Sequence, residues 1–321
     1  MMRAVGYRTA GGPGVLEDLE LPAPAPGPRD LLVRVAAVSV NPVDVKVRAG
    51  GDPGAEPRVL GFDAAGIVEA VGAEVTLFAP GDEVYYAGTI DRPGTNQQLH
   101  LVDERIAGRK PVSLSFAEAA ALPLTTITAW ETLFDRFRLD ADSTGTLLVV
   151  GAAGGVGSMV VQLARALTKI RVVGTASRTD SRQWALDLGA HEVIGHDEEP
   201  ADVDWIFSPF TAGQIERYAR ILRPGGAITA IDEPPGLDLL PLKTKSITFH
   251  WELMFTRPLL QTPDMVVQHE LLNRVSELID AGRVRHTMTA NLGPIDATNL
   301  RKAHELVEDG HMTGKVVLGG F

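Results

Sequence analysis

The sequence predicts an α/β protein in which a β-rich N-terminal domain precedes a doubly wound parallel sheet of six strands. Short apolar segments separated by Gly, Pro and Asp fill residues 1–122, a pattern typical of a β-rich domain. From residue 145 onward, strand patterns alternate with helical ones, which favours a parallel sheet because parallel neighbours need long crossovers. A glycine-rich turn links the first of these strands to a helix.

The N-terminal domain is expected to be a small barrel or sandwich. Its predicted strands are rich in Val, Leu and Tyr and cover residues 4–7, 31–40, 65–71, 83–87 and 98–102. Asn41 and Pro42 follow one of them and predict the start of a short helix. Ser115 and Glu118 form a capping-box pattern before an Ala-rich helix, and we place the domain boundary near Leu122.

The second domain is expected over residues 123–261. Its six predicted strands are 146–150, 170–175, 192–194, 204–207, 227–231 and 246–251. Helical patterns such as 181–188 and 214–222 lie between them, as a complete dinucleotide-binding domain requires. Residues 262–321 are too few to stand alone, so we expect this segment to complete the N-terminal domain.

The glycine-rich turn has the strand–turn–helix context of a phosphate-binding unit. An apolar run over 147–150 predicts a buried parallel strand, and apolar residues recur at helical spacing over 156–167. Gly154 would let a pyrophosphate approach the backbone, and Gly157 would let helix and strand pack closely. The helix N-terminus would add N–H groups and a positive dipole end.

The end of the second strand favours NADPH over NADH. NAD-binding relatives of this fold carry an Asp or Glu about 20 residues past the turn, which bonds the ribose hydroxyls. Here the strand ends in Ser177 and Arg178, and Asp180 is the first carboxylate. A hydroxyl and a guanidinium bind a 2′-phosphate, which a carboxylate would repel. The alternative is that Arg178 is an ordinary surface residue. His196 follows the third strand, on the adenosine side of the expected site.

Composition and motifs exclude several other classes. A net charge of -11 argues against a nucleic-acid or anionic-membrane partner. No run approaches the length of a membrane span or a signal peptide, and the absence of cysteine suits a reducing compartment, so a cytoplasmic location is expected. The eight histidines lack zinc-site spacing, and no nucleophile elbow occurs. A bound nicotinamide is therefore expected to do the chemistry.

Several motifs, taken together, resemble those of one family. They are Asn41-Pro-Val-Asp44, Leu60-Gly-Phe-Asp-Ala-Ala-Gly66, Gly81-Asp-Glu-Val84, Ala120-Ala-Leu-Pro-Leu-Thr125, Ala152-Ala-Gly-Gly-Val-Gly157, Thr175-Ala-Ser-Arg178, Trp251-Glu-Leu-Met-Phe-Thr-Arg257 and Gly314-Lys-Val-Val-Leu318. The chain resembles, end to end, the zinc-free quinone oxidoreductase branch of the medium-chain dehydrogenase/reductase superfamily, and within it the bacterial zinc-type alcohol dehydrogenase-like proteins.

The resemblance implies a GroES-like domain around an inserted Rossmann domain, with NADPH in the interdomain cleft and a homodimeric assembly. Zinc-dependent relatives place Cys where Asn41 stands and His-Glu where Phe62 and Asp63 stand, so no metal is expected. Quinone reductases of the branch often carry Tyr near position 46, which is Lys46 in this chain. Asn41, Lys46 and Tyr86 are the polar candidates for the catalytic site.

The resemblance also assigns cofactor contacts by position. Thr125 would contact the nicotinamide amide, and Asn41 would lie beside the nicotinamide and substrate. The remaining candidates are Ala152, Gly154, Gly155, Val156 and Gly157 at the pyrophosphate, Ser177, Arg178 and His196 around the 2′-phosphate, Phe210, Ile231 and Phe249 along the cofactor, and Lys315. Phe249 and Ile231 have an equal alternative as core residues.

The expected function is NADPH-dependent hydride transfer to quinones without zinc. An acceptor that becomes anionic benefits from a nearby cation, a role that Lys46 could fill. One alternative is an alkenal or enone double-bond reductase on the same scaffold. The other is a non-catalytic NADPH-binding protein.

Overall fold

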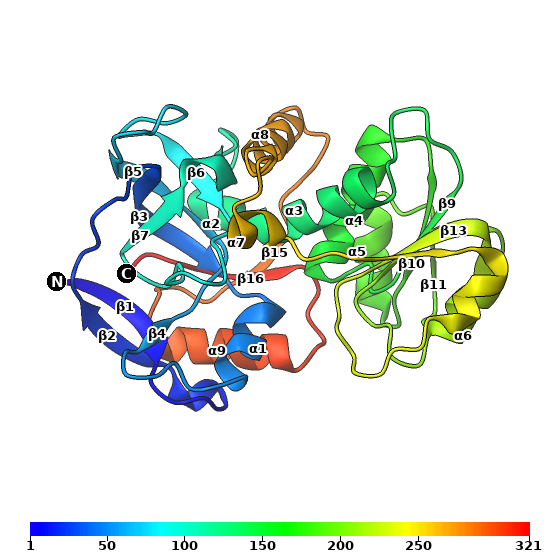
Figure 1. Ribbon diagram of the computed structural model, residues 1–321, viewed down its shortest axis with the longest axis horizontal. Helices are drawn as coiled ribbons and strands as arrows, with labels where there is room; N and C mark the ends of the chain where they lie inside the picture. The colour runs from blue at the N-terminus through cyan, green and yellow to red at the C-terminus, as the bar shows by residue number, and fades with distance from the viewer. The chain divides into compact units, whose positions relative to one another are not determined.

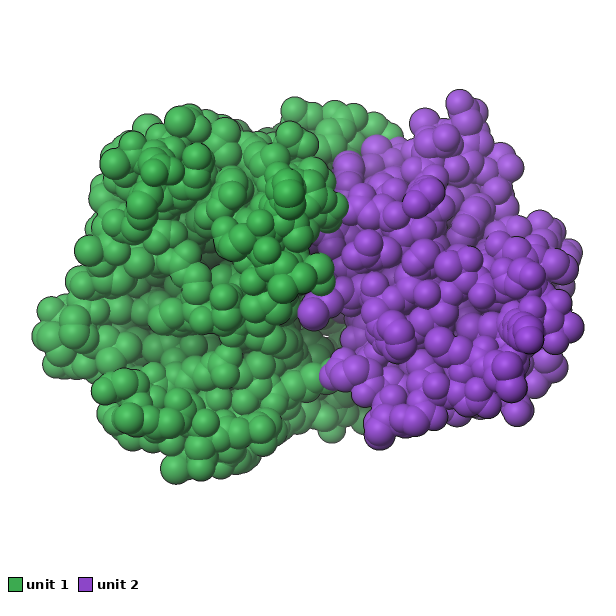
Figure 2. Space-filling view, in the orientation of Figure 1, with its two compact units in different colours: residues 1–124, 255–321 green, residues 125–254 purple.

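The computed structural model describes residues 1–321 and contains two compact units, which Figure 2 shows in separate colours. Unit 1 comprises Met1–Leu124 and Phe255–Phe321, and unit 2 comprises Thr125–Met254. The sequence prediction instead placed the boundaries after residues 122 and 261. No helix in either unit combines the length and apolar character that crossing a bilayer would require.

Unit 2 is built on a six-stranded parallel sheet with the order β11-β10-β9-β12-β13-β14. Its strands are β9 (Thr146–Val149), β10 (Arg171–Thr175), β11 (Glu192–Ile194), β12 (Val203–Ser208), β13 (Leu222–Ala230) and β14 (Thr248–Trp251). Every predicted strand of this domain is present, and the doubly wound fold is confirmed. The strand order reverses between β9 and β12, the point at which such sheets bind ligands.

Helices precede the first strand of this sheet and connect several of the later ones. They are α3 (Pro123–Trp130), α4 (Gly155–Leu167), α5 (Thr179–Asp187) and α6 (Ile215–Ile221), with a π-helical segment at Glu131–Arg136 and a 3-10 segment at Leu240–Lys245. One core cluster joins Leu148, Val173, Ile206 and Ile228 from four strands with Tyr218 of α6. Leu147, Leu148 and Val149 of β9 are consecutive and all fully buried, so both faces of the sheet are covered there, which explains the continuous apolar run.

Unit 1 contains two sheets. The larger has the order β15-β16-β3-β5-β6-β8, with β7 also paired to β3, and the smaller has the order β2-β1-β4. The strands are β1 (Met2–Tyr7), β2 (Glu17–Leu21), β3 (Asp30–Ser39), β4 (Arg58–Val59), β5 (Ala64–Val71), β6 (Glu83–Tyr86), β7 (Leu99–Asp103), β8 (Ala107–Arg109), β15 (Met288–Asn291) and β16 (Lys315–Gly319). The sequence did not predict β2, because its Glu and Asp residues have low strand propensity.

The two chain segments of unit 1 meet in its larger sheet. Strand β16 pairs antiparallel with β3, with Val317 opposite Ser39. The helices of unit 1 are α1 (Pro42–Ala49), α2 (Phe116–Ala120), α7 (Thr256–Leu260), α8 (Val267–Asp280) and α9 (Ala297–Glu308), with 3-10 turns at Pro13–Val15 and Glu104–Ile106. Figure 1 shows α9 beside α1. A side-chain contact joins the two helices, because the buried Arg48 guanidinium of α1 lies 2.8 Å from Nδ1 of His304 on α9.

Candidate functional site

The glycine turn between β9 and α4 has no room for a side chain at Gly157. A Cβ there would lie 2.9 Å from Cα of Ala152 and closer still to the carbonyl oxygen of Gly151. Gly151 itself has a φ of 68°, a conformation that favours glycine. Backbone geometry therefore requires glycine at both positions. Gly151 adopts a positive φ in the tight turn, and Gly157 lies where α4 packs directly on that turn.

The N-terminus of α4 provides donors at this turn. The first helical bond runs from Ser158 N–H to the Gly154 carbonyl at 2.8 Å. The N–H groups of Gly155, Val156 and Gly157 precede it and have no carbonyl one turn earlier in the helix. A Cβ at Gly154 would meet only the Gly151 carbonyl, at 3.4 Å, so its absence leaves the backbone open. The turn therefore fits a pyrophosphate, which such N–H groups and the helix dipole attract.

The residues expected at the adenosine end lie at the carboxyl ends of β10 and β11. Ser177 and His196 are exposed, and Arg178 caps α5, with its Nε 3.5 Å from an Asp180 carboxylate oxygen. Nδ1 of His196 lies 2.9 Å from Oγ1 of Thr175, the last residue of β10. A hydroxyl, a guanidinium and an imidazole thus follow adjacent strands of one sheet.

Arg182 has a different role from Arg178. Its guanidinium donates to the carbonyl oxygens of Ala176, at 3.2 Å, and Val193, at 2.5 Å. These bonds join the residue after β10 to β11. Arg182 therefore stabilises the loop that carries Ser177 and Arg178.

The candidates on later elements have unlike environments. Phe210, after β12, is 71% exposed, whereas Ile231, after β13, is half-buried. Phe249 lies within β14, packs against the core of unit 2 and contacts the Trp251 ring at a centroid distance of 4.9 Å. Thr125, on α3, is buried. Phe249 thus has the packing of a core residue, the alternative already considered for it.

Unit 1 contains a buried polar cluster at the start of α1. Asn41 caps this helix, and its Nδ2 donates to Oδ2 of Asp63 at 2.7 Å. The Lys315 ammonium donates to the Asn41 side-chain oxygen and lies 3.4 Å from Oδ2 of Asp63. Asp63 also accepts from the Ser39 hydroxyl and the Leu124 N–H, each at 2.8 Å. Both ends of the Asn41 amide are therefore bonded inside unit 1.

Burial shifts the pKa values of the ionisable groups in this cluster. Desolvation raises the pKa of Asp44 to about 7, against the opposing hydrogen bonds from the N–H groups of Asn41 and Gly61. Burial also raises the pKa of Asp63, and the Lys315 charge opposes that rise. Burial lowers the pKa of Lys315, which the carboxylates of Asp63 and Asp44 counteract. The cluster thus holds two carboxyl groups and one amine away from water.

This cluster does not fit a zinc ion. Zinc sites use thiolate, imidazole or carboxylate ligands, usually three or four together. Here Asn41 contributes an amide, Phe62 a hydrocarbon ring and Lys315 an ammonium, so the cluster supplies only the carboxyl groups of Asp44 and Asp63 as possible ligands. No group of three or more His, Cys, Asp or Glu side chains that could hold a metal ion occurs in the structure.

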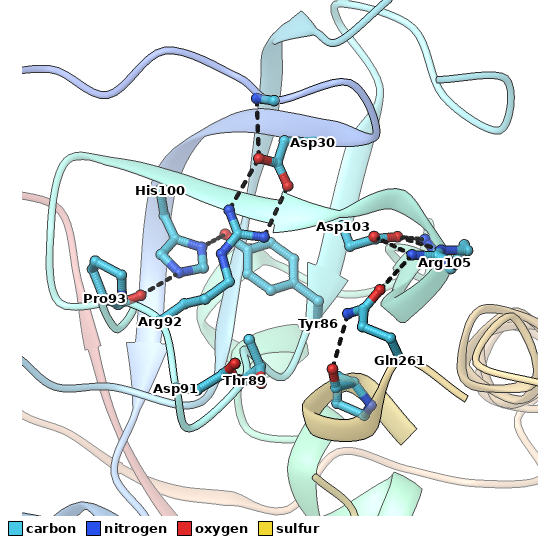
Figure 3. A network of polar contacts seen from close by, with 12 residues as sticks. Asp30, Tyr86, Thr89, Asp91, Arg92, Pro93, His100, Asp103, Arg105 and Gln261 are labelled. Carbon is cyan, nitrogen blue, oxygen red and sulfur yellow. Dashed lines mark hydrogen bonds and ion pairs between the residues drawn. The ribbon is translucent and has the colours of Figure 1, made fainter. Parts of the chain in front are cut away.

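The other two catalytic candidates are not part of this cluster. Lys46 is exposed on α1. The Tyr86 side chain is fully buried, and its ring stacks on His100 at a centroid distance of 5.5 Å (Figure 3). Nε2 of His100 lies 3.1 Å from the Pro93 carbonyl, which only accepts, so Nδ1 accepts from the Tyr86 hydroxyl, also at 3.1 Å.

Burial explains the ionisation of this pair as well. It raises the pKa of Tyr86 and lowers the pKa of His100 to about 4, so both rings stay neutral near pH 7. The Tyr86 hydroxyl thus donates a hydrogen bond to the buried Nδ1 of His100. Beside them, the Arg92 guanidinium binds both carboxylate oxygens of Asp30, at 2.8 and 3.0 Å (Figure 3).

Sequence reasoning did not single out Thr175, Asp44 or Ser39 as site residues, and it treated Asp63 only as the replacement of a metal ligand. Thr175 and Asp63 stand within recognisable motifs, which is the one signal that could have drawn attention to them. Their partners, His196 and Lys315, are 21 and 252 residues away in the chain. Only the fold brings these partners together.

A dinucleotide-binding sheet with this strand order, joined to a GroES-like domain, defines a two-domain oxidoreductase. The family model of the alcohol dehydrogenase GroES-like domain matches residues 27–130, and that of the zinc-binding dehydrogenases matches residues 188–318. A zinc-type alcohol dehydrogenase-like protein of Staphylococcus aureus (strain COL) is 42% identical over 92% of this chain and 92% of its own. The chain belongs to the medium-chain dehydrogenase/reductase superfamily, among the zinc-type alcohol dehydrogenase-like proteins.

More distant relatives differ in their named reactions. The NADPH-dependent alkenal/one oxidoreductase of Arabidopsis thaliana is 28% identical over 99% of this chain and 79% of its own. A Rhizobium etli CFN 42 structure, named after the zinc-dependent alcohol dehydrogenases, covers 100% of this chain and 98% of its own, with 50% identity and a TM-score of 0.95. Escherichia coli quinone oxidoreductase, complexed with NADPH, covers 99% of both chains, with 26% identity and a TM-score of 0.84.

Proposed function

We propose that this oxidoreductase uses NADPH to reduce quinones by hydride transfer, without zinc. The observation that carries the proposal is the adenosine end of the site in unit 2. Ser177, Arg178 and His196 follow β10 and β11 there, where NAD-specific proteins of this fold place a carboxylate. The E. coli quinone oxidoreductase complexed with NADPH supports the same choice of cofactor and acceptor.

The residues of unit 2 would hold the cofactor. The N–H groups at the start of α4 would bind the pyrophosphate, and Ser177, Arg178 and His196 would surround the 2′-phosphate. Thr125, Phe210 and Ile231 remain proposed contacts along the cofactor, and NADPH when bound would supply the hydride.

The residues of unit 1 would act on the acceptor. Lys46 is our candidate for stabilising the anion that a quinone becomes, since it is exposed and cationic. Asn41 is held rigidly by Asp63 and Lys315, so its role would be to shape the site rather than to move a proton. We leave Tyr86 out of proton delivery because its hydroxyl is bonded to His100 in the core.

A second candidate function is reduction of the double bond in alkenals or enones. It is favoured by the similarity to the Arabidopsis alkenal/one oxidoreductase. Both reactions need the same cofactor site and an acceptor that gains negative charge, so the shape of the substrate pocket decides between them.

The test is NADPH oxidation with 1,4-benzoquinone, 9,10-phenanthrenequinone, an alkenal and a simple aldehyde, each repeated with NADH and with a chelator. We expect the fastest turnover with quinones and NADPH, unchanged by the chelator. A faster alkenal reaction would move the assignment to double-bond reduction. Stoichiometric zinc by elemental analysis, with activity lost to the chelator, would overturn the zinc-free proposal.

The role of Lys46 is tested separately. Lys46→Ala should lower kcat for quinones by about tenfold, which corresponds to about 1.4 kcal/mol of transition-state stabilisation. Lys302→Ala is the matched control, because Lys302 is also an exposed helical lysine of unit 1. Equal kinetics in both variants would remove Lys46 from the mechanism.

A further inference from the structure

A single buried hydroxyl connects three strand ends in unit 2. Thr175, at the end of β10, is 1% exposed. Its Oγ1 accepts a hydrogen bond from the Gly151 N–H at 3.0 Å, in the turn after β9. The same oxygen lies 2.9 Å from Nδ1 of His196, in the loop after β11. Gly151, in the glycine turn, and His196, proposed to bind the 2′-phosphate, thus share Oγ1 of Thr175 as a hydrogen-bond partner.

The chemistry of these groups fixes the direction of the bond from Gly151, whereas the direction of the bond to His196 follows the tautomer of the imidazole. An amide N–H only donates, so Oγ1 accepts from Gly151 and has its own proton to give. Nδ1 of His196 is positioned to accept that proton. In the tautomer that accepts this proton at Nδ1, the ring hydrogen is on Nε2, at the other edge of an exposed ring, where it can be donated to an anionic oxygen.

The backbone on both sides of this link is held by other bonds. Gly195 N–H donates to the Glu198 carboxylate at 2.7 Å, and Glu198 N–H donates back to the Gly195 carbonyl at 3.2 Å. The Thr175 carbonyl accepts from Ala152 N–H at 3.1 Å. Because the main chain is also held by these other bonds, the proton of the Thr175 hydroxyl can be used to orient the His196 ring while its oxygen accepts from Gly151.

We propose that Thr175 is a positioning residue that sets the preference for NADPH over NADH. It would do so without touching the cofactor, by presenting Nε2–H of His196 to the 2′-phosphate. This inference rests on the proposed binding of NADPH at this site. It predicts that loss of the hydroxyl weakens binding of the phosphorylated cofactor much more than binding of NADH.

The experiment measures Kd for NADPH and NADH by fluorescence titration of the full-length protein, so that no turnover is needed. Thr175→Val keeps the shape of the side chain and removes the hydroxyl. We expect it to raise the Kd for NADPH about tenfold and the Kd for NADH about twofold. The larger change is about the size expected for losing one hydrogen bond to a charged group. Thr175→Ser restores a hydroxyl and should restore the preference.

Two further variants separate this role from a general effect of the substitution. Thr229→Val is the matched control, because Thr229 is equally buried in β13 of the same sheet and its hydroxyl has no hydrogen-bond partner. It should leave both Kd values unchanged. In a His196→Ala background, Thr175→Val should no longer alter the ratio of the two Kd values, since the group it orients is gone.

The outcomes distinguish this inference from the proposed function. A wild-type protein without preference for NADPH would overturn both. If the wild type prefers NADPH and Thr175→Val keeps that preference, the positioning role alone is overturned. The same holds if Thr175→Val weakens the binding of NADPH and NADH equally. If Thr175→Val does not fold, histidine-selective 15N NMR of the wild type decides: an Nε2–H tautomer of His196 supports the inference, and an Nδ1–H tautomer overturns it.

Discussion

At the scale of single residues, unit 2 contains a buried carboxyl group that keeps its proton near neutral pH. Glu252 is 4% exposed, and burial raises its pKa to about 9, with a further rise from its hydrogen bond to Glu131. Arg136 opposes the rise through a bond of 2.7 Å to Oε2. Burial and the neighbouring Glu131 therefore favour the protonated form of Glu252.

This pair makes unit 2 less stable as the pH rises from 7 to 9. The folded state keeps the proton of Glu252 over this range, whereas the unfolded state has lost it above about pH 4.3. Folding therefore takes up a proton, and the free energy of unfolding falls with pH until about pH 9.

Glu252→Gln mimics the protonated acid, so the Tm measured by calorimetry should fall less steeply with pH in this variant than in the wild type. Glu216→Gln, at an exposed position on α6, is the control and should leave the slope unchanged. An identical slope in Glu252→Gln would show that this carboxyl group does not titrate in that range.

At the scale of elements, the turn between β9 and α4 was predictable because its signals are local. Continuous apolar runs indicate buried strands, and the spacing of Gly154 and Gly157 indicates the turn. Strand β2 was not predictable in this way, since Glu17–Leu21 forms a strand only by pairing with β1. The sequence predicts elements that a local pattern specifies. It does not predict elements that form only by pairing with another segment of the chain.

The two glycines of this turn should respond differently to alanine. Gly157→Ala forces a Cβ against the backbone of Gly151 and Ala152, so we expect a loss of about 2–4 kcal/mol in the free energy of unfolding. Gly154→Ala meets the Gly151 carbonyl only at an ordinary contact distance, so folding should be nearly normal while NADPH affinity falls. Urea unfolding and fluorescence titration of both variants check this. Similar stabilities would show that α4 can move away from the turn.

At the scale of the whole molecule, unit 1 is completed by a segment from the other end of the chain. Strand β16 pairs with β3, and its Lys315 reaches Asn41 and Asp63. The sequence suggested Asn41 and Lys315 as separate candidates near the cofactor, without a reason to join them. The structure shows that the Lys315 ammonium donates to the Asn41 side-chain oxygen in the interior of unit 1. Such pairings depend on the register of distant strands, which no local pattern encodes.

The Lys315–Asp63 pair should therefore contribute strongly to the stability of unit 1. Lys315→Met leaves the Asp63 carboxylate buried without its cation, which costs about 3–5 kcal/mol near neutral pH. The loss should shrink toward pH 5, because the raised pKa of Asp63 would let it bind a proton in the folded state. Asp63→Asn combined with Lys315→Met removes both charges and should recover part of the stability.

Lys110 supplies the matched control for this test. It is also buried, but its carboxylate partner Glu83, 3.1 Å away, has a side chain that is 49% exposed and that water can solvate. Lys110→Met should therefore cost less than Lys315→Met and show little recovery on lowering the pH. Urea unfolding of the wild type and the three variants at pH 5 and pH 7.5 measures these differences. Equal losses in Lys315→Met and Lys110→Met at both pH values would mean that the amine at Lys315 contributes packing alone, and that the charge of Asp63 is compensated by its hydrogen bonds.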